Sequence, residues 1–296
     1  MTQNPLITVF TPTYNRAYTL GRLYNSLLNQ TNKDFEWLIV DDGSTDNTKA
    51  LIQSFIDDNK INITYFYKPN GGKHTAINSG VDTARGEFFF IVDSDDYLLN
   101  SATEDIYMQL EKIRGREKFA GISGVKVLSD MKTIGKEMCE NIIETDLITF
   151  RNKMGIKGDR AEVFYTHILR KYKFPVFEDT KFCSEGVVFN KIANDGFLLR
   201  FFNTPLTICE YLPDGLSFNH YKRNKNNIKS TMLCYEELFS YRLDMFFKIK
   251  TCINYWRYSF FSERKFFENM KAMHYWGVLL YPAGLLFMIY SELRNR

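Results

Sequence analysis

Apolar segments alternate with amphipathic segments through the first hundred residues of the chain. Four runs rich in β-branched and aromatic residues have no polar alternation, which is typical of strands buried on both faces. They cover residues 7–10, 37–40, 63–67 and 88–92. Between them, apolar side chains recur every three or four residues, which predicts helices around 20–28 and 51–56 and from about 75 to 85. Strands that alternate with helices predict a mostly parallel sheet flanked by helices.

Capping residues indicate where these helices begin and end. Ser44 is expected to be the N-cap of the second helix, and Gly86 is expected to stop the third. A later helix is expected to open at Ser184 and to stop at Gly196. These signals extend the predicted α/β pattern into the middle of the chain.

Composition narrows the class of protein. The 296 residues are 45% hydrophobic, which is enough for one large domain or one domain with an appendage. The 38 Lys and Arg against 35 Asp and Glu give a net charge of only +3, so bulk charge does not indicate nucleic-acid binding. Five cysteines without a C-x-x-C pair suit reduced thiols in a cytoplasm. The N-terminus enters a strand pattern almost at once, so we expect no export signal.

Polar loops follow three of the predicted strands. They read "TPTYNR", "DDGSTD" and "DSDD" after the first, second and fourth strands. Ligands of open α/β sheets bind beyond the carboxyl ends of the strands, so these loops should face one crevice. No G-x-G-x-x-G motif follows the first strand, and "NGGKH" at 70–74 is not a Walker loop, because Tyr67 stands where its first glycine belongs. A bound phosphate would therefore need a cation.

The acidic loop offers a place for that cation. Side chains two apart in an extended backbone point the same way, so Asp93 and Asp95 should share a ligand while Ser94 turns away. Two carboxylates at this spacing suit Mn²⁺ or Mg²⁺ carrying a nucleotide diphosphate. The alternative is an acidic surface turn ahead of a helix that starts near Ser101.

Two long segments resemble a known family. "TVFTPTYNRAYTLGRLYNSLLNQTNKDFEWLIVDDGSTDNT" and "GGKHTAINSGVDTARGEFFFIVDSDDYL" are similar to the nucleotide-sugar half of inverting family 2 glycosyltransferases with the GT-A fold, over roughly residues 5–100. The resemblance implies a metal-dependent hexosyltransferase of bacterial surface polysaccharide synthesis. It would move a sugar from a nucleotide-diphosphate sugar, UDP-linked by preference, to a hydroxyl of a glycan or lipid-linked acceptor.

The resemblance also implies a set of donor-binding residues. Those expected to line the base and ribose are Thr11, Pro12 and Tyr14. Asp41 would face the base with Asp42 nearby, and Lys73 would lie close to the base or the phosphates. Asp93 and Asp95 would hold the metal and the sugar diphosphate, and Ser94 belongs to the same donor-binding loop.

The acceptor side and the catalytic base are expected within residues 101–228. Many family members carry a Glu-Asp pair at the start of a helix here, and the matching residues are Glu185 and Gly186, so the aspartate is absent. Glu185 is the first candidate for the base and Asp179 is the second. A basic loop with His220, Lys222, Arg223 and Lys225, preceded by a turn at Asp214-Gly215, is expected to fold over the diphosphate.

The last part of the chain changes character. We expect a GT-A domain at 1–228, with a donor half at 1–100 and an acceptor half at 101–228, followed by a helical C-terminal extension at 229–296. An apolar run at 275–290 is short for a membrane crossing, and Pro282 should kink it. With its interleaved aromatic and basic residues, the extension is expected to lie on the cytoplasmic leaflet of the membrane. The alternative is a helical cap or a homo-oligomer interface.

Two functions from other classes remain open. A nucleotidyltransferase also uses paired aspartates and a metal, but it would need a glycine-rich, basic loop after the first strand, and "TPTYNR" is not such a loop. A catalytically idle sugar-nucleotide-binding or scaffold protein is consistent with the absent aspartate at Gly186.

Overall fold

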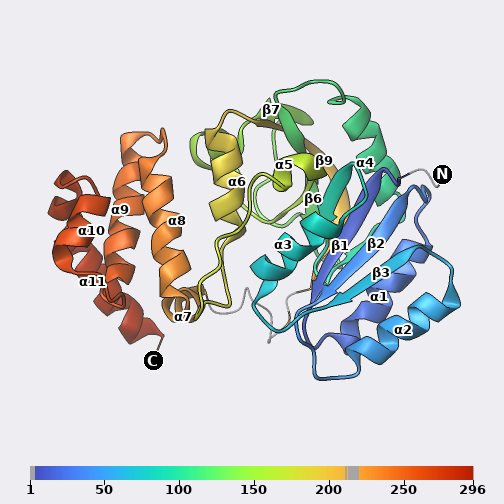
Figure 1. The fold of residues 1–296 in the computed structure, drawn as a ribbon. Coiled ribbons are helices and arrows are strands. Elements are labelled where there is room, and N and C mark those ends of the chain that lie inside the picture. Colours follow the sequence, from blue (N-terminus) through green and yellow to red (C-terminus); the bar gives the residue numbers. More distant parts are fainter. Residues whose placement is uncertain (1–3, 211, 213–219, 296) are drawn as a thin grey trace.

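A mixed sheet forms the centre of the protein. The structure is a computed structural model that describes residues 4–210, 212 and 220–295 (Figure 1). Within these residues the sheet has nine strands in the order β3-β2-β1-β4-β8-β6-β9-β5, and β7 pairs with β9. β1, β2, β3, β4, β6 and β9 run in one direction, and β5, β7 and β8 run in the other. The predicted mostly parallel α/β sheet is confirmed.

The first four strands lie where the apolar pattern predicts them. They are β1 (Ile7–Thr13), β2 (Phe35–Asp41), β3 (Ile63–Tyr67) and β4 (Phe88–Ile91). β1 and β2 are buried throughout, as expected of strands covered on both faces. The same expectation is wrong for β3, whose side chains are half-buried or exposed. β3 is the terminal strand of the sheet order, so it has a neighbour on one side only.

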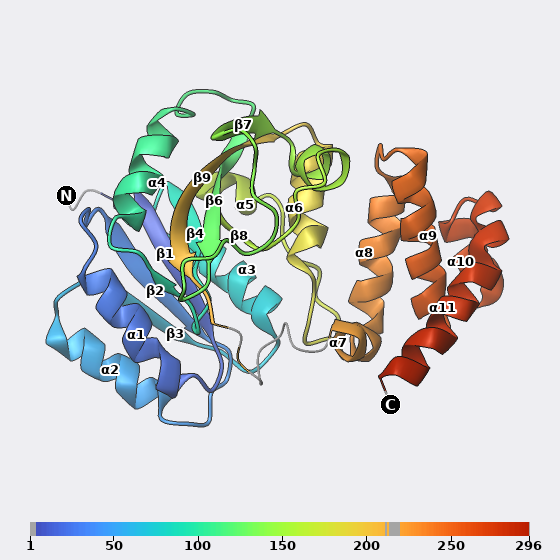
Figure 2. The same cartoon turned by 180° about the vertical axis from the view of Figure 1, so that it is seen from behind.

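Three helices connect these strands, with α3 on one face of the sheet and α1 and α2 on the other (Figures 1 and 2). They are α1 (Ala17–Leu28), α2 (Thr48–Asp58) and α3 (Lys73–Thr83). The predicted caps are wrong in two places. Asn47 is the N-cap of α2, because the Ser44 hydroxyl instead accepts a hydrogen bond from the Asn15 amide at 2.8 Å. α3 ends at Thr83, and the Gly86 amide beyond it donates to the Thr8 hydroxyl.

The second half of the domain continues the same sheet. Its elements are β5 (Tyr97–Leu98), α4 (Ala102–Glu111), β6 (Phe119–Val127), β7 (Ile142–Thr145), the π-helix η1 (Thr149–Lys153), β8 (Arg160–Tyr165), α5 (Thr166–Leu169), α6 (Glu185–Asn194) and β9 (Leu198–Ile208). β8 lies antiparallel between β4 and β6, so the predicted donor and acceptor halves share one core. α6 begins after its N-cap Ser184, as predicted, and Gly196 follows its end with a φ of +94°.

A stack of helices extends from one side of this domain (Figures 1 and 2). It contains α7 (His220–Asn226), α8 (Ile228–Ser240), α9 (Met245–Ser259), α10 (Phe266–Ala272), the 3₁₀ helix η2 (Trp276–Leu280) and α11 (Tyr281–Arg294). The stack has its own core around Cys252, Tyr255 and Trp256. α8 joins the two parts, because Met232 packs in this second core while Leu238 packs against the core of the sheet. The predicted boundary at 228/229 falls in the first turn of α8.

The last helix packs on α9 through small residues. The Trp256 indole donates to the Gly277 carbonyl at 2.8 Å, and a Cβ on Gly284 would lie 2.3 Å from the Trp256 Cβ. Pro282 lies in the first turn of α11, where the amide that a proline lacks would have no partner within the helix, so it does not interrupt α11. The helical segment continues to Arg294, and among the described residues Trp276–Arg294 alone is long and apolar enough to cross a membrane, with a mean hydropathy of 1.3. The helical segment is thus longer than the apolar run at 275–290 on which the prediction of a segment too short to cross was based.

Candidate functional site

The loops after β1, β2 and β4 meet at one edge of the sheet. The Asp42 amide donates to the Thr13 carbonyl at 2.8 Å, which joins the first two loops. The Val92 amide donates to the Phe10 carbonyl at 2.9 Å, which fixes the start of the acidic loop beside β1. The three loops that the sequence predicted to share a crevice are therefore held together by backbone contacts.

The residues predicted to line the nucleotide base differ in accessibility. Thr11 and Pro12 are buried within β1, and the Thr11 hydroxyl accepts a hydrogen bond from the Trp37 indole at 3.0 Å. Tyr14 is exposed in the loop that follows. Tyr14 is thus accessible to a ligand, whereas the side chain of Thr11 is bound within the protein. Their contacts with a nucleotide stay predictions.

Asp41 and Asp42 are buried and organise neighbouring backbone. Asp41 accepts hydrogen bonds from the Ser44 amide and the Tyr65 hydroxyl, each at 2.8 Å. Asp42 accepts from the Gly71 amide at 2.9 Å and the Gly72 amide at 2.6 Å, and the ammonium of Lys68 lies 2.5 Å from it. Because Asp42 is already engaged in this way, it stabilises the turn that leads into α3. The predicted contacts of Asp41 and Asp42 with a base remain untested.

Burial alternates along the acidic loop, although residues 93–96 form a turn, in which the Asp96 amide donates to the Asp93 carbonyl at 3.0 Å, and not the extended backbone that the sequence prediction assumed. Asp93 and Asp95 are half-buried on the accessible side, whereas Ser94 and Asp96 are buried. Asp96 accepts a hydrogen bond from the Cys209 thiol, with a sulfur–oxygen distance of 3.1 Å. The loop therefore presents two carboxylates to solvent and anchors itself through the third.

Two lysines supply positive charge around this loop. Lys73 Nζ lies 2.6 Å from Asp93 Oδ1 and 2.9 Å from Glu185 Oε1, so it links the acidic loop to the first turn of α6. Buried Lys126 lies 3.0 Å from Asp96 Oδ2 and 4.0 Å from Asp93 Oδ2. Lys126 was missed in the sequence, although a lysine inside the apolar strand "GVKV" is a signal that could have found it.

The half-buried carboxylates Asp93 and Asp95 are in different electrostatic environments. Burial alone would raise the pKa of Asp93, but Lys73 and Lys126 outweigh it and hold that pKa below its ordinary value. Burial, with the neighbouring charges of Asp93 and Asp96, raises the pKa of Asp95 to about 6. Among the described residues no cationic side chain forms an ion pair with Asp95. Arg16 lowers that pKa, but less than burial and the two acidic neighbours raise it, which fits a site for a cation.

The protein provides only part of a metal coordination shell. Within the described residues no three His, Cys, Asp or Glu side chains converge to bind a metal ion. Asp93 and Asp95 offer carboxylate oxygens, the ligand type that Mn²⁺ and Mg²⁺ prefer, and such ions often take their other ligands from phosphate and water. The residues thus fit a metal that arrives with a diphosphate rather than one enclosed by protein.

Of the two candidate bases, the structure brings one to the acidic loop. Glu185 opens α6, and Lys73 connects it to Asp93. Asp179 lies on the preceding loop with 82% of its side chain exposed, and its carboxylate is 3.5 Å from Lys229. A Cβ on Gly186 would lie 3.3 Å from the Asn190 side-chain amide nitrogen and 3.4 Å from the Ser184 hydroxyl.

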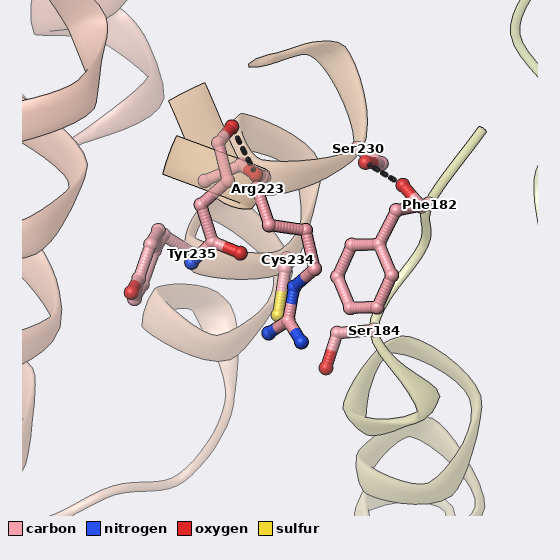
Figure 3. Close-up of a pocket in the computed structure, with 8 residues that line it drawn as sticks. Phe182, Ser184, Arg223, Ser230, Cys234 and Tyr235 are labelled. Carbon is pink, nitrogen blue, oxygen red and sulfur yellow. Dashed lines mark hydrogen bonds between the residues drawn. The ribbon is translucent and has the colours of Figure 1, made fainter. Parts of the chain in front are cut away.

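The predicted basic loop is partly helical. His220, Lys222, Arg223 and Lys225 lie on α7, and Asp214-Gly215 falls outside the described residues. The guanidinium of Arg223 stacks on the Phe182 ring at 3.9 Å and points toward Ser184 at the start of α6 (Figure 3). Lys225 instead pairs with Glu292 of α11 at 2.8 Å. Arg223 is thus the member of this group that borders the site, beside a cavity of about 110 Å³.

Known proteins similar in sequence are glycosyltransferases. A model of the Glycosyl transferase family 2 matches residues 8–172. The chain is 35% identical to the GalNAc(5)-diNAcBac-PP-undecaprenol beta-1,3-glucosyltransferase of Campylobacter jejuni, over 57% of this chain and 55% of that protein. It is 28% identical to the poly(ribitol-phosphate) beta-N-acetylglucosaminyltransferase TarP of Staphylococcus aureus, over 74% of this chain and 67% of that protein. The chain therefore spans about half the length of the first relative.

Solved structures share the fold at low identity. The S. aureus TarS structure with UDP-GlcNAc superposes with a TM-score of 0.65 at 21% identity, over 90% of this chain and 79% of that one. A mannosyltransferase of Pyrobaculum calidifontis, solved with GDP-Man and Mn²⁺, gives a TM-score of 0.52 at 18% identity, over 96% and 74% of the two chains. These likenesses show the GT-A fold. Because the family model covers more than half of the sequence, the chain belongs to glycosyl transferase family 2.

Proposed function

We propose that the protein is a metal-dependent inverting glycosyltransferase that moves a sugar from a UDP-sugar to a hydroxyl of a glycan or lipid-linked acceptor. The observation that carries the proposal is that Lys73 pairs with both Asp93 and Glu185, so that the acidic loop with Asp93 and Asp95 lies beside the candidate base. The UDP-GlcNAc in the TarS structure supports a UDP-linked donor. The undecaprenol diphosphate in the name of the Campylobacter relative supports a lipid-linked acceptor in surface polysaccharide synthesis.

Each residue has a distinct task in this reaction. Asp93 and Asp95 would hold Mn²⁺ or Mg²⁺, which stabilises negative charge on the departing diphosphate when it is bound. Lys73 adds a positive charge between Asp93 and Glu185. The acceptor oxygen attacks C1 of the donor sugar on the side opposite UDP, the C1–O bond to UDP breaks, and the hydroxyl proton passes to the Glu185 carboxylate. Arg223 is proposed to contact the diphosphate from α7.

Replacing the base separates Glu185 from Asp179. Loss of a positioned general base costs roughly 10² to 10⁴ in rate, so Glu185→Gln should lose at least 10²-fold in transfer while it binds UDP nearly as well as the wild type. Asp179→Asn should be milder, because its carboxylate is largely exposed and faces Lys229. Release of UDP from UDP-GlcNAc and from UDP-glucose, with and without Mn²⁺, measures both variants. The reverse order would move the base to Asp179, and near-normal rates in both would place it elsewhere.

We also propose that the helical extension binds the cytoplasmic face of a membrane, close to a lipid-linked acceptor. The side of η2 and α11 turned away from α9 is apolar, with Leu279, Leu286 and Leu293 exposed by 77%, 67% and 68%. Tyr275, Trp276 and Tyr290 are exposed on the same segment, and aromatic rings favour the lipid headgroup region. Exposed Lys265, Lys271 and Arg294 lie on α10 and α11, where anionic headgroups would attract them.

A catalytically idle sugar-nucleotide-binding protein is the second candidate, because the family resemblance implies an aspartate at the position of Gly186, which has no carboxylate. Release of UDP from a UDP-sugar distinguishes an active transferase from an idle binding protein. An idle protein would bind UDP in a Mn²⁺-dependent way without releasing UDP from any UDP-sugar. A nucleotidyltransferase would instead yield diphosphate and a new nucleotide linkage, so identification of the released product distinguishes it as well.

A further inference from the structure

Glu162 is a carboxylate on β8 that the proposed reaction does not use. Its side chain is only 14% exposed, and its one cationic partner among the described residues is Arg151, with a nitrogen–oxygen distance of 3.5 Å. Glu36 shows what a structural glutamate looks like in this fold. It is buried beside β1 and accepts hydrogen bonds from the Thr8 hydroxyl at 2.6 Å and from Arg85 at 2.7 and 2.8 Å. Glu162 can therefore accept further hydrogen bonds, whereas the carboxylate of Glu36 is already occupied by donors within the protein.

The strand register places Glu162 beside the acidic loop. Phe90 pairs with Val163, so the next position along puts Glu162 beside Ile91, two residues before Asp93. Because alternate side chains share a face, Glu162 and Asp93 lie on the same side of the sheet. Two residues further along β8, the Phe164 ring meets Phe189 of α6 at 4.6 Å. Glu162 therefore lies on the face that α6 covers, toward the edge where α6 begins with Glu185.

Charged groups from four elements face this carboxylate. Glu185 of α6 and Asp159 ahead of β8 add negative charge, whereas Arg151 of η1 and Lys126 of β6 oppose it. Burial is the largest effect, and together they raise the pKa of Glu162 to about 7. A second anion would be repelled by the three carboxylates, whereas hydroxyl groups would donate hydrogen bonds to them. The surroundings of Glu162 thus favour a neutral, hydroxyl-rich ligand over a phosphate.

We propose that Glu162 binds the acceptor sugar by accepting hydrogen bonds from its hydroxyls, and so holds the attacking hydroxyl beside Glu185. The proposal rests on the proposed function, because it names the acceptor side of the same site. The ligand class is a neutral pyranose. No proton is transferred to Glu162 in the reaction, since the ionised carboxylate acts only as a hydrogen-bond acceptor.

Saccharide binding to the UDP-loaded, Mn²⁺-containing protein tests this. The probes are octyl β-D-glucopyranoside and octyl N-acetyl-β-D-glucosaminide, each below its micellar concentration. Calorimetry measures their binding. Glu162→Gln should weaken probe binding about tenfold and leave UDP affinity within about twofold, because a charge-assisted hydrogen bond becomes a neutral one. Glu87→Gln is the matched control, since Glu87 is half-exposed and pairs with Arg114 next to the amino end of β4. Glu162→Asp keeps the charge on a shorter side chain, so its probe affinity should lie between those of the wild type and Glu162→Gln.

The pH dependence adds a signature that a packing role would not produce. Wild-type affinity for the probes should fall as the pH drops through about 7, because protonated Glu162 loses its charge, and Glu162→Gln should show no such step. In steady-state transfer to the same probes, Glu162→Gln should raise the acceptor KM with little change in kcat, whereas Glu185→Gln should lower kcat.

Three outcomes overturn the proposal. They are a wild type that binds neither probe, a Glu162→Gln protein that binds them normally, and a Glu162→Gln protein that loses kcat at an unchanged KM, which would make Glu162 the base. A failure of the donor site is recognised separately, because UDP would then not bind to the wild type in Mn²⁺. Melting temperatures of all variants identify a folding defect, and a defect shared by Glu162→Gln and Glu162→Asp without a change in probe affinity would make the residue structural.

Discussion

At the scale of single residues, the acidic loop shows how position sets charge. Asp93, Asp95 and Asp96 lie within four residues of one another, yet each meets a different environment. Asp93 is paired with Lys73, and buried Asp96 is paired with Lys126. Asp95 has neither partner, so burial and its two acidic neighbours raise its pKa. Asp95 is therefore the carboxylate with the most to gain from a cation.

Substitution of Asp95 should weaken UDP binding without destabilising the fold. We expect Asp95→Ala to abolish turnover and to weaken UDP binding in Mn²⁺, while the melting temperature of the metal-free protein stays equal or rises, because the substitution removes repulsion. Calorimetry with UDP, with and without Mn²⁺, measures the first effect. Asp57→Ala on the exposed side of α2 is the control. Unchanged UDP affinity in the variant, or full wild-type activity in EDTA, would exclude the metal role.

Breaking the buried ion pair between Lys126 and Asp96 should, in contrast, lower the stability of the protein. Lys126→Met leaves Asp96 without its cation, and loss of one partner of a buried ion pair costs roughly 3–5 kcal/mol. Burial already raises the pKa of Asp96, and the substitution raises it further, so the destabilisation should be largest above that pKa and shrink as the pH falls and the carboxyl becomes neutral. Urea unfolding at several pH values tests this. Adding Asp96→Asn should restore part of the loss, and no restoration would contradict the account.

At the scale of elements, the turn into α3 connects the two halves of the site. Gly72 is the N-cap of α3 with a φ of +95°, and a Cβ there would lie 2.0 Å from the Lys181 carbonyl oxygen. The next residue is Lys73, which reaches both Asp93 and Glu185. The close approach at Gly72 therefore fixes where the bridging lysine starts.

Gly72→Ala should damage the site more than backbone strain alone explains. Gly115 is the matched control, because it has a φ of +76° and open space around the position of a Cβ. Gly115→Ala should lose about 1 kcal/mol of unfolding free energy from backbone strain, and Gly72→Ala should lose more, because its φ of +95° and ψ of 158° lie in a region that is essentially restricted to glycine. Only Gly72→Ala should also weaken UDP binding, because the loop at Lys181 and the start of α3 must move apart. Equal UDP affinities in the two variants would show that the Lys181 contact does not matter.

At the scale of the whole molecule, the protein has two hydrophobic cores joined by α8. The sheet core holds the nucleotide site, and the second core holds the helices whose outer surface is apolar. A truncation before Lys248 would cut α9 and uncover Met232 and Phe239 on α8. Such a protein should aggregate, so point substitutions on α11 are the better test of what the extension does.

Vesicle binding tests the extension directly. The wild type should cosediment with vesicles that contain phosphatidylglycerol, and Leu286→Glu with Leu293→Glu should release it, because both leucines project from the apolar side of α11. High salt should release only part of the wild type, since screening weakens the electrostatic contribution and leaves the apolar one. Met108→Glu, on the exposed side of α4, is the control. A wild type that ignores vesicles and forms a dimer, which the leucine variants convert to a monomer, would make this surface an oligomer interface.

The order of strands and helices was readable from the sequence because the periods of apolar residues are local. β1, β2, β4 and α6 lie where their patterns placed them. Helix ends were less predictable. Ser44 looks like a cap in isolation, but its hydroxyl is taken by Asn15, a residue from another loop.

The sequence by itself determined the parallel strands β1 to β4, the motifs at their carboxyl ends and the family, since each depends on residues close together in the chain. The tertiary structure alone decided which charges meet. It placed Lys73 between Asp93 and Glu185, buried Lys126 against Asp96 and set Glu162 on the same face as Asp93. It also determined that Asp179 faces solvent. Such contacts join residues from separate strands and helices, so their electrostatics depend on burial and distance, which no local pattern of residues encodes.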